Sequence, residues 1–410
     1  MRDFTRPRGG ARGRPRGGAR GRPRGRPRGG ARHVGGLVLA TVLAITIGAM
    51  ITSTEDPVRV IPAGAATPSP RPAETLQQLL TEQATALNRG DLTGWLAPVA
   101  PPLRQRYQNL FRTLRALRAT VAYRAGKGGK AELTYCFTPK CPDNSPKIAQ
   151  TLKSSSGKIT ALAPAPGPEP TPWEQGDLIF AQGKRVTIGA PQALKPRLAD
   201  IVQIADEAAR VDDRYAAYAG NRQARYRLYL ATDQTWRTWY GGKATEWAVG
   251  YMQPLGPAGA DVVINPGRLP TRAALREVIQ HELAHVATIS GVSTRHEDMW
   301  LVEGVAEYIG MQPRRAADTY SRIALRRPTR LNPPPLRDGA SPKEVAAFYA
   351  AGHFAVDCLV THFGEPRAME FVRQRLRLGE SLDDAARSAF GKPFTTVDHT
   401  CVETIEHQTI

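Results

Sequence analysis

The stretch that decides the fold is His281-Glu282-Leu283-Ala284-His285. Around it, residues 271–289 carry apolar side chains at helical spacing, which predicts one helix. Residues four apart lie one turn above each other on a helix, so both imidazoles project from one face and can bind a single zinc ion. Glu282 lies beside that face, where a general base can reach a metal-bound water.

A second segment supplies a third ligand. It reads Trp300-Leu301-Val302-Glu303-Gly304-Val305-Ala306-Glu307-Tyr308, and Glu303 lies eighteen residues past His285. We expect this second helix to begin near Asp298, as its N-cap, and to end near Gly310. Two histidines and one carboxylate leave the fourth zinc position open, which is typical of catalytic rather than structural sites. The sequence therefore predicts one Zn²⁺ per chain, held by His281, His285 and Glu303.

HELAH followed by WLVEGVAEY resembles the gluzincin metallopeptidases, especially the aminopeptidase-like branch whose second helix reads W-L-x-E-G-x-A. The resemblance covers about residues 186–410 and implies hydrolysis of peptide bonds in a peptide or protein substrate. It implies that His281, His285 and Glu303 are the zinc ligands and that Glu282 is the general base. It also implies that Glu307 orients a ligand histidine by accepting its other ring N–H. An exposed helix glutamate is the alternative for Glu307.

The same resemblance extends to Phe348-Tyr349-Ala350-Ala351-Gly352-His353, which is similar to a Y-x-x-G segment of those aminopeptidases. It implies that the Tyr349 hydroxyl donates to the oxyanion of the tetrahedral intermediate. His353 is a possible alternative donor, and packing in the core is the alternative for Tyr349. One departure is that no G-x-M-E-N string precedes His281, so exopeptidase specificity does not carry over. Residues 248–252 are expected at an edge strand instead.

The charge pattern at the amino terminus predicts where the protein lies in the cell. Residues 1–33 hold 12 Arg and one Asp, so +11 of the net charge of +19 lies there. Residues 34–52 carry no charge and, as a helix, can span about 28 Å of hydrocarbon. The charge asymmetry predicts a single-pass protein of the cell membrane, with a cytoplasmic N-terminus and an extracellular catalytic domain.

We expect residues 53–73 to form a stalk linker. The expected partners are the lipid bilayer through residues 34–52, and anionic lipid headgroups near the Arg-rich tail. An RNA-binding arm is the alternative for residues 1–33, but we expect no specific nucleic acid. A cleavable signal peptide ending at Ala63-Gly64-Ala65 is the alternative for the anchor.

Four cysteines fit an exported domain. Cys136 and Cys141 suit a small disulfide loop, and Cys358 and Cys401 would then pair with each other. Four cysteines allow three connectivities, and the sequence does not choose among them.

A separate accessory domain is expected over residues 74–185. Helices are predicted over residues 74–96, with a break at 88–91, and over residues 103–117. Strands are predicted at residues 120–124, 131–135 and 177–180. The opening L-x-x-x-x-x-A-L-x-x-G-D resembles the start of nuclear-transport-factor-like α+β domains, and we interpret the module as a spacer or recognition domain.

Together these features predict an α+β protein. It would have a single transmembrane helix, the small α+β accessory domain and, over residues 186–410, a zincin-like peptidase domain with a mainly helical C-terminal part. The predicted function is a membrane-anchored extracellular zinc metallopeptidase. The alternative is a non-catalytic cell-surface binding protein that retains a peptidase-like fold; the presence of every ligand and of the base favours the enzyme.

Overall fold

The computed structural model describes residues 72–164, 169–174, 178–242, 248–326, 328, 330–337 and 339–409. Residues 1–33 and 34–52, nearly all of the predicted stalk and the alternative cleavage site Ala63-Gly64-Ala65 lie outside these ranges.

The predicted transmembrane helix is the point on which the expected fold was wrong. No helix in the described ranges is long and apolar enough to cross a membrane. Even the 24-residue helix α4 (Lys195–Tyr218) carries charged side chains along its length. Residues 34–52, from which the prediction came, are not among the described residues. The single-pass location in the cell membrane therefore has no support, and the fold class is corrected to α+β, with no membrane helix among the described residues.

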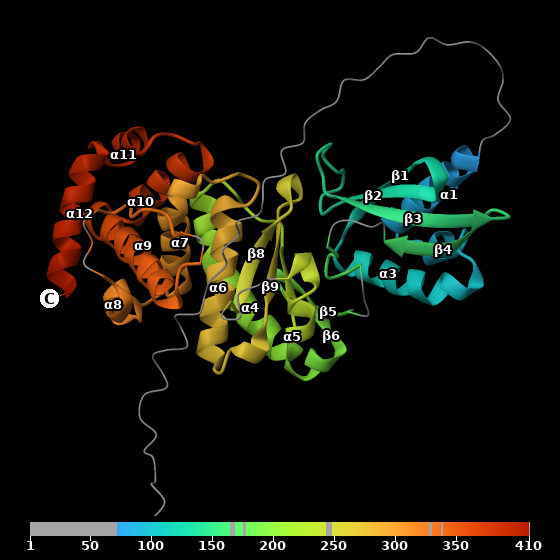
Figure 1. Cartoon of the computed structure of the whole chain (residues 1–410), viewed down its shortest axis with the longest axis horizontal. Coiled ribbons are helices and arrows are strands. Elements are labelled where there is room, and N and C mark those ends of the chain that lie inside the picture. The colour runs from blue at the N-terminus through green and yellow to red at the C-terminus, as the bar shows by residue number, and fades with distance from the viewer. Residues whose placement is uncertain are drawn as a thin grey trace, which may run out of the picture. The chain divides into compact units, whose positions relative to one another are not determined.

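The first part of the described chain is a helical layer on an antiparallel sheet (Figure 1). Its helices are α1 (Pro72–Arg89), α2 (Leu92–Leu96) and α3 (Arg104–Ala116), and its strands are β1 (Thr120–Ala125), β2 (Lys130–Cys136), β3 (Lys147–Ser155) and β4 (Lys158–Pro164). The strands are paired in the order β1-β2-β3-β4. The break between α1 and α2 falls at the predicted place, where Gly90 adopts a φ of 77°. Strands β3 and β4 were not predicted.

A five-stranded sheet begins the second part. Its strands are β5 (Leu178–Gln182), β6 (Val186–Pro191), β7 (Tyr226–Leu230), β8 (Gly250–Pro254) and β9 (Ala260–Ile264). The order is β5-β6-β7-β9-β8, in which β6, β7 and β9 are parallel and the two edge strands are antiparallel to their neighbours. The strand predicted at 177–180 within the accessory domain is β5, which pairs with β6 of this sheet. Strand β8 is the expected edge strand.

Both faces of this sheet are covered, because successive side chains of a strand point to opposite sides. Leu228, Val262 and Ile264 face a core shared with helices α4 and α6 (Arg272–Ile289). Tyr229, Tyr251 and Val263 face the other way, into a core shared with the accessory domain. Buried residues from the two domains therefore form one continuous cluster.

The remaining chain is mainly helical, as expected. After α7 (Met299–Gly310) come α8 (Ser321–Ala324), α9 (Pro342–Phe363), α10 (Glu365–Val372), α11 (Leu382–Phe390) and α12 (Phe394–Thr409). A disulfide between Cys358 and Cys401 ties α9 to α12, and a second closes the loop from Cys136 to Cys141. The expected pairing is confirmed, and two disulfides are typical of proteins from oxidising compartments.

Candidate metal centre

Helix α6 carries the HELAH segment through the interior. It begins after Thr271, whose side chain accepts a hydrogen bond from the Ala274 N–H, and almost its whole circumference is buried. Helix α7 lies beside it, and a Cβ added at Gly310 would come within 3.0 Å of the His281 Cβ. The two helices approach this closely because position 310 has no side chain.

The start of α7 differs from the expected capping. Asp298 precedes the helix as predicted, but its side chain makes no capping hydrogen bond. It instead accepts a 2.7 Å hydrogen bond from the Arg375 guanidinium, which is 77 residues later in the chain. The entry to the helix that bears Glu303 is therefore fixed by a buried ion pair.

The three predicted ligands meet in one cluster. Nε2 of His281 lies 3.2 Å from Nε2 of His285, and Oε2 of Glu303 lies 3.5 Å and 3.4 Å from these two atoms. Ligand atoms bound 2.0–2.1 Å from a tetrahedral zinc lie roughly 3.3 Å from one another, so the three edges fit such an ion. All three residues are 1 % exposed, and together they can hold a metal ion.

The residues of this cluster strongly shift one another's pKa values. Burial alone lowers the pKa of His281, but hydrogen bonds with Glu303 and Glu307 outweigh it and raise that pKa to about 10. Burial raises the pKa of Glu303, yet the two histidines outweigh it and lower the value to about 2. Three converging lone pairs at these distances need a positive charge among them, from a proton or from a cation.

Glu307 lies behind the first ligand. Its Oε1 is 3.3 Å from Nδ1 of His281, and its side chain is fully buried. A carboxylate in this position fixes the ring so that Nε2 points toward the other two ligands. The alternative that Glu307 is an exposed helix glutamate is therefore wrong.

Glu282 faces the edge of the sheet. Its side chain is fully buried, and a Cβ added at Gly250 in β8 would lie 2.9 Å from its Oε1. Burial raises the pKa of Glu282 to about 7, against the opposing effect of His281 and His285. A carboxylate with a pKa near neutrality suits both the uptake and the release of a proton.

Tyr349 and His353 occupy different surroundings one turn apart on α9. The Tyr349 ring stacks on His281, with centroids 6.2 Å apart and planes 13° apart. Burial raises its pKa well above the usual range, and the adjacent Glu303 carboxylate adds to this. Nδ1 of His353 instead lies 3.0 Å from the Ser321 hydroxyl, and burial lowers the pKa of His353 to about 4. Of the two candidates, Tyr349 is the one against the ligand cluster.

Two residues near the cluster were not predicted. Asp212 on α4 is fully buried, neither of its carboxylate oxygens has a hydrogen-bond partner among the described residues, and its charge interacts with His281. Asp212 shares the buried stripe of α4 with Ala208, Ala209 and Tyr215. A carboxylate at this position of the apolar helical repeat would have predicted a buried charge. Tyr320 interacts with Glu307, but it lies in a connecting segment with no recognisable motif.

No protein-family model matches this chain, and no curated protein is significantly similar to it in sequence.

Proposed function

We propose that this protein is a zinc-dependent metallopeptidase. The observation that carries the proposal is the triangle of His281, His285 and Glu303, whose edges of 3.2–3.5 Å fit a tetrahedral metal ion. Glu282 follows His281 directly in the chain and lies at the edge strand of the sheet. Three ligands, a base and an edge strand beside that base together support hydrolysis of a bound polypeptide.

The donor set favours zinc among biological cations. Two imidazole nitrogens and one carboxylate suit Zn²⁺, whereas Mg²⁺ and Ca²⁺ prefer sites made of oxygen ligands alone. Three protein ligands leave one position for water or substrate, as in catalytic zinc sites. What zinc supplies when bound is a water of lowered pKa and polarisation of the scissile carbonyl.

The protein's own residues perform the remaining steps. Glu282 takes the proton of the attacking water and passes it to the leaving amine, for which its pKa of about 7 is suited. Strand β8 is an edge strand, so its outer backbone groups can pair with an extended peptide. That pairing would place a peptide bond beside Glu282, because a Cβ added at Gly250 of β8 would lie 2.9 Å from Oε1 of this carboxylate. The Tyr349 hydroxyl is the candidate donor to the oxyanion.

The test is Glu282→Gln, which keeps the shape of the side chain and removes the proton acceptor. We expect the variant to keep one zinc per chain and to cleave an unfolded protein substrate at least ~10²-fold more slowly than the wild type. Metal content is measured by atomic spectroscopy and cleavage by mass spectrometry of the products. Glu82→Gln, the same change at an exposed position of α1, is the matched control and should cleave normally.

The same experiment separates the enzyme from the non-catalytic alternative. A zinc-loaded wild type that cleaves no protein or peptide in a proteome-derived library would favour a binding protein. A Glu282→Gln variant that cleaves as fast as the wild type would contradict the general-base role.

A further inference from the structure

The exposed face of α3, in the accessory domain, carries a row of arginines. The helix reads RQRYQNLFRTLRA and contains no acidic residue and no lysine. Arg104, Arg112 and Arg115 are exposed and lie on one face, because residues three, four or eight apart in a helix lie one above the other. We call these three residues the arginine stripe. At 1.5 Å per residue, the stripe is roughly 16 Å long.

The fold supplies no counter-ion for the arginine stripe. Within the ranges that the structure describes, none of its three guanidinium groups forms an ion pair or a hydrogen bond. Asp91 is close by in the chain, since a Cβ added at the preceding Gly90 would lie 3.2 Å from Nη2 of Arg115. Its Oδ1 instead accepts a 2.9 Å hydrogen bond from the Gly94 N–H and caps α2. Like charges on one helix face repel each other, so an anion bound along the stripe would stabilise them.

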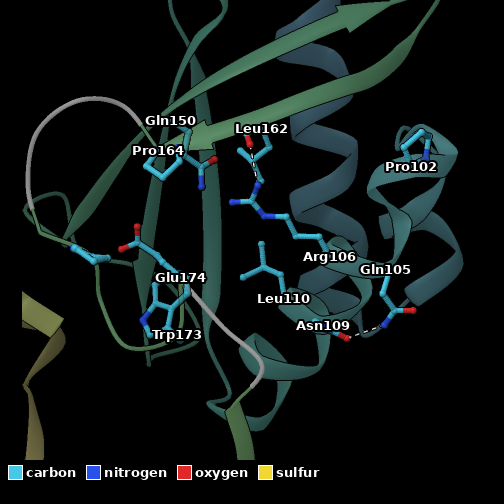
Figure 2. Close-up of a pocket in the computed structure, with 11 residues that line it drawn as sticks. Pro102, Gln105, Arg106, Asn109, Leu110, Gln150, Leu162, Pro164, Trp173 and Glu174 are labelled. Carbon is cyan, nitrogen blue, oxygen red and sulfur yellow. Dashed lines mark hydrogen bonds between the residues drawn. The ribbon is translucent and has the colours of Figure 1, made fainter. Parts of the chain in front are cut away.

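Other polar side chains of α3 have partners within the protein. Arg106 extends toward β4 and donates a 2.8 Å hydrogen bond to the Leu162 carbonyl (Figure 2). Gln105 donates to Oδ1 of Asn109 at 3.0 Å, one turn along the same helix (Figure 2). The lack of partners is therefore a property of the arginine stripe and not of the whole helix.

The positive surface continues past the end of the helix. Arg118 follows α3, is exposed and makes no ion pair with a described residue. Burial lowers the pKa of Arg225, and the positive charge of Arg118 adds to this against the opposing effect of Asp206. The Arg225 guanidinium donates to the backbone carbonyls of Lys184 and Val186. Like charges therefore adjoin one another at this end of α3 as well.

The chemistry of the arginine stripe fits the carboxylates of an acidic polypeptide. A guanidinium group donates two parallel hydrogen bonds to one carboxylate. An extended polypeptide advances about 3.3 Å per residue, so about five residues span the stripe and acidic side chains can reach all three arginines. The net charge of +19 also attracts acidic chains from a distance.

Two other polyanions fit less well. Proteins that bind single-stranded nucleic acid stack its bases on aromatic side chains, but the aromatic residues of α3, Tyr107 and Phe111, are buried. Helices that lie on membranes insert apolar side chains. The large exposed apolar residues within the described ranges are Ile323 and Leu378, and both belong to the C-terminal helical part. An acidic polypeptide requires neither feature.

We propose that the arginine stripe docks acidic stretches of the polypeptide substrate. Tyr107 and Phe111, on the opposite face of α3, belong to the hydrophobic cluster that contains Tyr251 of β8. A polypeptide docked on the stripe is therefore held on the same packed body as the candidate metal centre, which raises the local concentration of its cleavable bonds. That the docked polypeptide is a substrate rests on the proposed peptidase function; the docking itself does not.

The binding test uses the full chain as Glu282→Gln, with EDTA present, so that neither catalysis nor metal contributes. The probe is a blocked hexaglutamate peptide with p-benzoylphenylalanine at its centre, which attaches covalently to neighbouring residues under ultraviolet light. Mass spectrometry of chymotryptic peptides separates attachment to α3 from attachment to the arginines of residues 1–33. We expect attachment to α3 about tenfold above that of the same peptide with glutamine in place of each glutamate.

The stripe variant, Arg104→Gln with Arg112→Gln and Arg115→Gln, should lower this attachment about tenfold. Its Tm should stay the same, because the three side chains are exposed and have no partner among the described residues. Loss of attachment without loss of stability therefore excludes misfolding as the cause.

The matched control takes three charges from exposed positions of the β1–β2 hairpin in the same domain: Arg124→Gln, Lys127→Gln and Lys130→Gln. It should keep full attachment to α3. Equal attachment of the acidic and the glutamine probes to α3, unchanged attachment in the stripe variant, or attachment confined to residues 1–33 would overturn the proposal. Displacement of the probe by single-stranded RNA, or by vesicles rich in phosphatidylglycerol, at concentrations where polyglutamate has no effect would also overturn it, and would assign the stripe to nucleic acid or to a membrane.

A kinetic measurement connects docking to cleavage. A peptide that the wild type cleaves is extended, through a Gly/Ser linker, by a hexaglutamate or a hexaglutamine tail. We expect the acidic tail to lower KM about tenfold in the wild type and in the hairpin control, and to have no effect in the stripe variant. Attachment of the probe to α3 in a protein that cleaves nothing would contradict the peptidase function alone. Cleavage by the wild type with the same KM for both tails would contradict the docking of substrate alone.

Discussion

Gly304 and Gly352 lie backbone to backbone where α7 and α9 cross. A Cβ added at Gly304 would come within 2.4 Å of the Gly352 carbonyl oxygen, and one added at Gly352 within 2.4 Å of the Trp300 carbonyl oxygen. Glu303 precedes the first glycine, and Tyr349 lies three residues before the second. The crossing therefore explains why these two glycines accompany the candidate-ligand and tyrosine motifs: their lack of side chains lets Tyr349 approach the candidate metal centre.

Gly352→Ala tests this relationship. Alanine favours a helix interior by about 1 kcal/mol over glycine, but here its methyl group must push two helices apart. We expect a net loss of about 1–3 kcal/mol in the free energy of unfolding and weaker metal binding, because α9 moves away from α7. Ala351→Gly, at the adjacent half-buried position, is the control: it should cost about 1 kcal/mol and leave metal affinity unchanged. Equal metal affinity in both variants would contradict the positioning role of the crossing.

Much of the candidate site could be predicted because its signals are local. The spacing of His281 and His285 is one helical turn, and the helix bounds follow from Thr271 and Gly310, so periodicity and capping chemistry sufficed. The accessory helices were predicted for the same reason.

The features that could not be predicted depend on partners distant in sequence. Asp298 looked like a helix cap, but Arg375 binds it from 77 residues away. Strand β5 was assigned to the accessory domain because it lies before residue 186, where the peptidase domain was expected to begin, whereas its hydrogen-bond partner β6 belongs to the second sheet. The predicted transmembrane helix rested on the absence of charge over residues 34–52, and none of the described helices supports it.

Metal binding should depend on the ligands and on Glu307 to different extents. His285→Ala removes one of three ligands and should abolish stoichiometric zinc. Glu307→Gln keeps the size of the side chain but weakens its hold on the His281 ring, so zinc affinity should fall about 10–100-fold. Competition with a chelator measures both. Zinc retained at full affinity in Glu307→Gln would show that the 3.3 Å contact does not orient the ligand.

The affinity for zinc should rise with pH. In the metal-free cluster the pKa of His281 is raised to about 10, so this histidine carries a proton at neutral pH. A ligand histidine must be neutral, so binding releases that proton. Raising the pH weakens the competition by protons, and the apparent affinity should increase about tenfold per pH unit between about pH 6 and 8. Calorimetry in buffers of different ionisation enthalpy counts the released protons. A pH-independent affinity would show that the cluster carries no such proton.

The two disulfides should contribute unequally to stability. Cys358 and Cys401 are 43 residues apart, whereas Cys136 and Cys141 are five apart. In the loop-entropy model the longer loop stabilises by about 4 kcal/mol and the shorter by about 2 kcal/mol. Replacing each pair with alanines and measuring unfolding by denaturant compares them. A larger loss from the Cys136/Cys141 pair would indicate that its loop stabilises the fold through native contacts rather than chain entropy.

Substitutions of Tyr349 and of His353 should have different effects on kcat and on stability. Tyr349→Phe keeps the ring that stacks on His281 and removes only the hydroxyl, so folding and zinc content should be unchanged. If that hydroxyl binds the oxyanion in the transition state, kcat should fall on the order of 10²–10³-fold with little change in KM. His353→Ala removes a fully buried ring that contacts Ser321, so it should lower stability while the remaining folded enzyme keeps most of its kcat. The opposite pattern, full kcat in Tyr349→Phe and a large loss in folded His353→Ala, would assign the donor role to His353. Full kcat in both variants would mean that the metal alone stabilises the oxyanion and that Tyr349 only packs in the core.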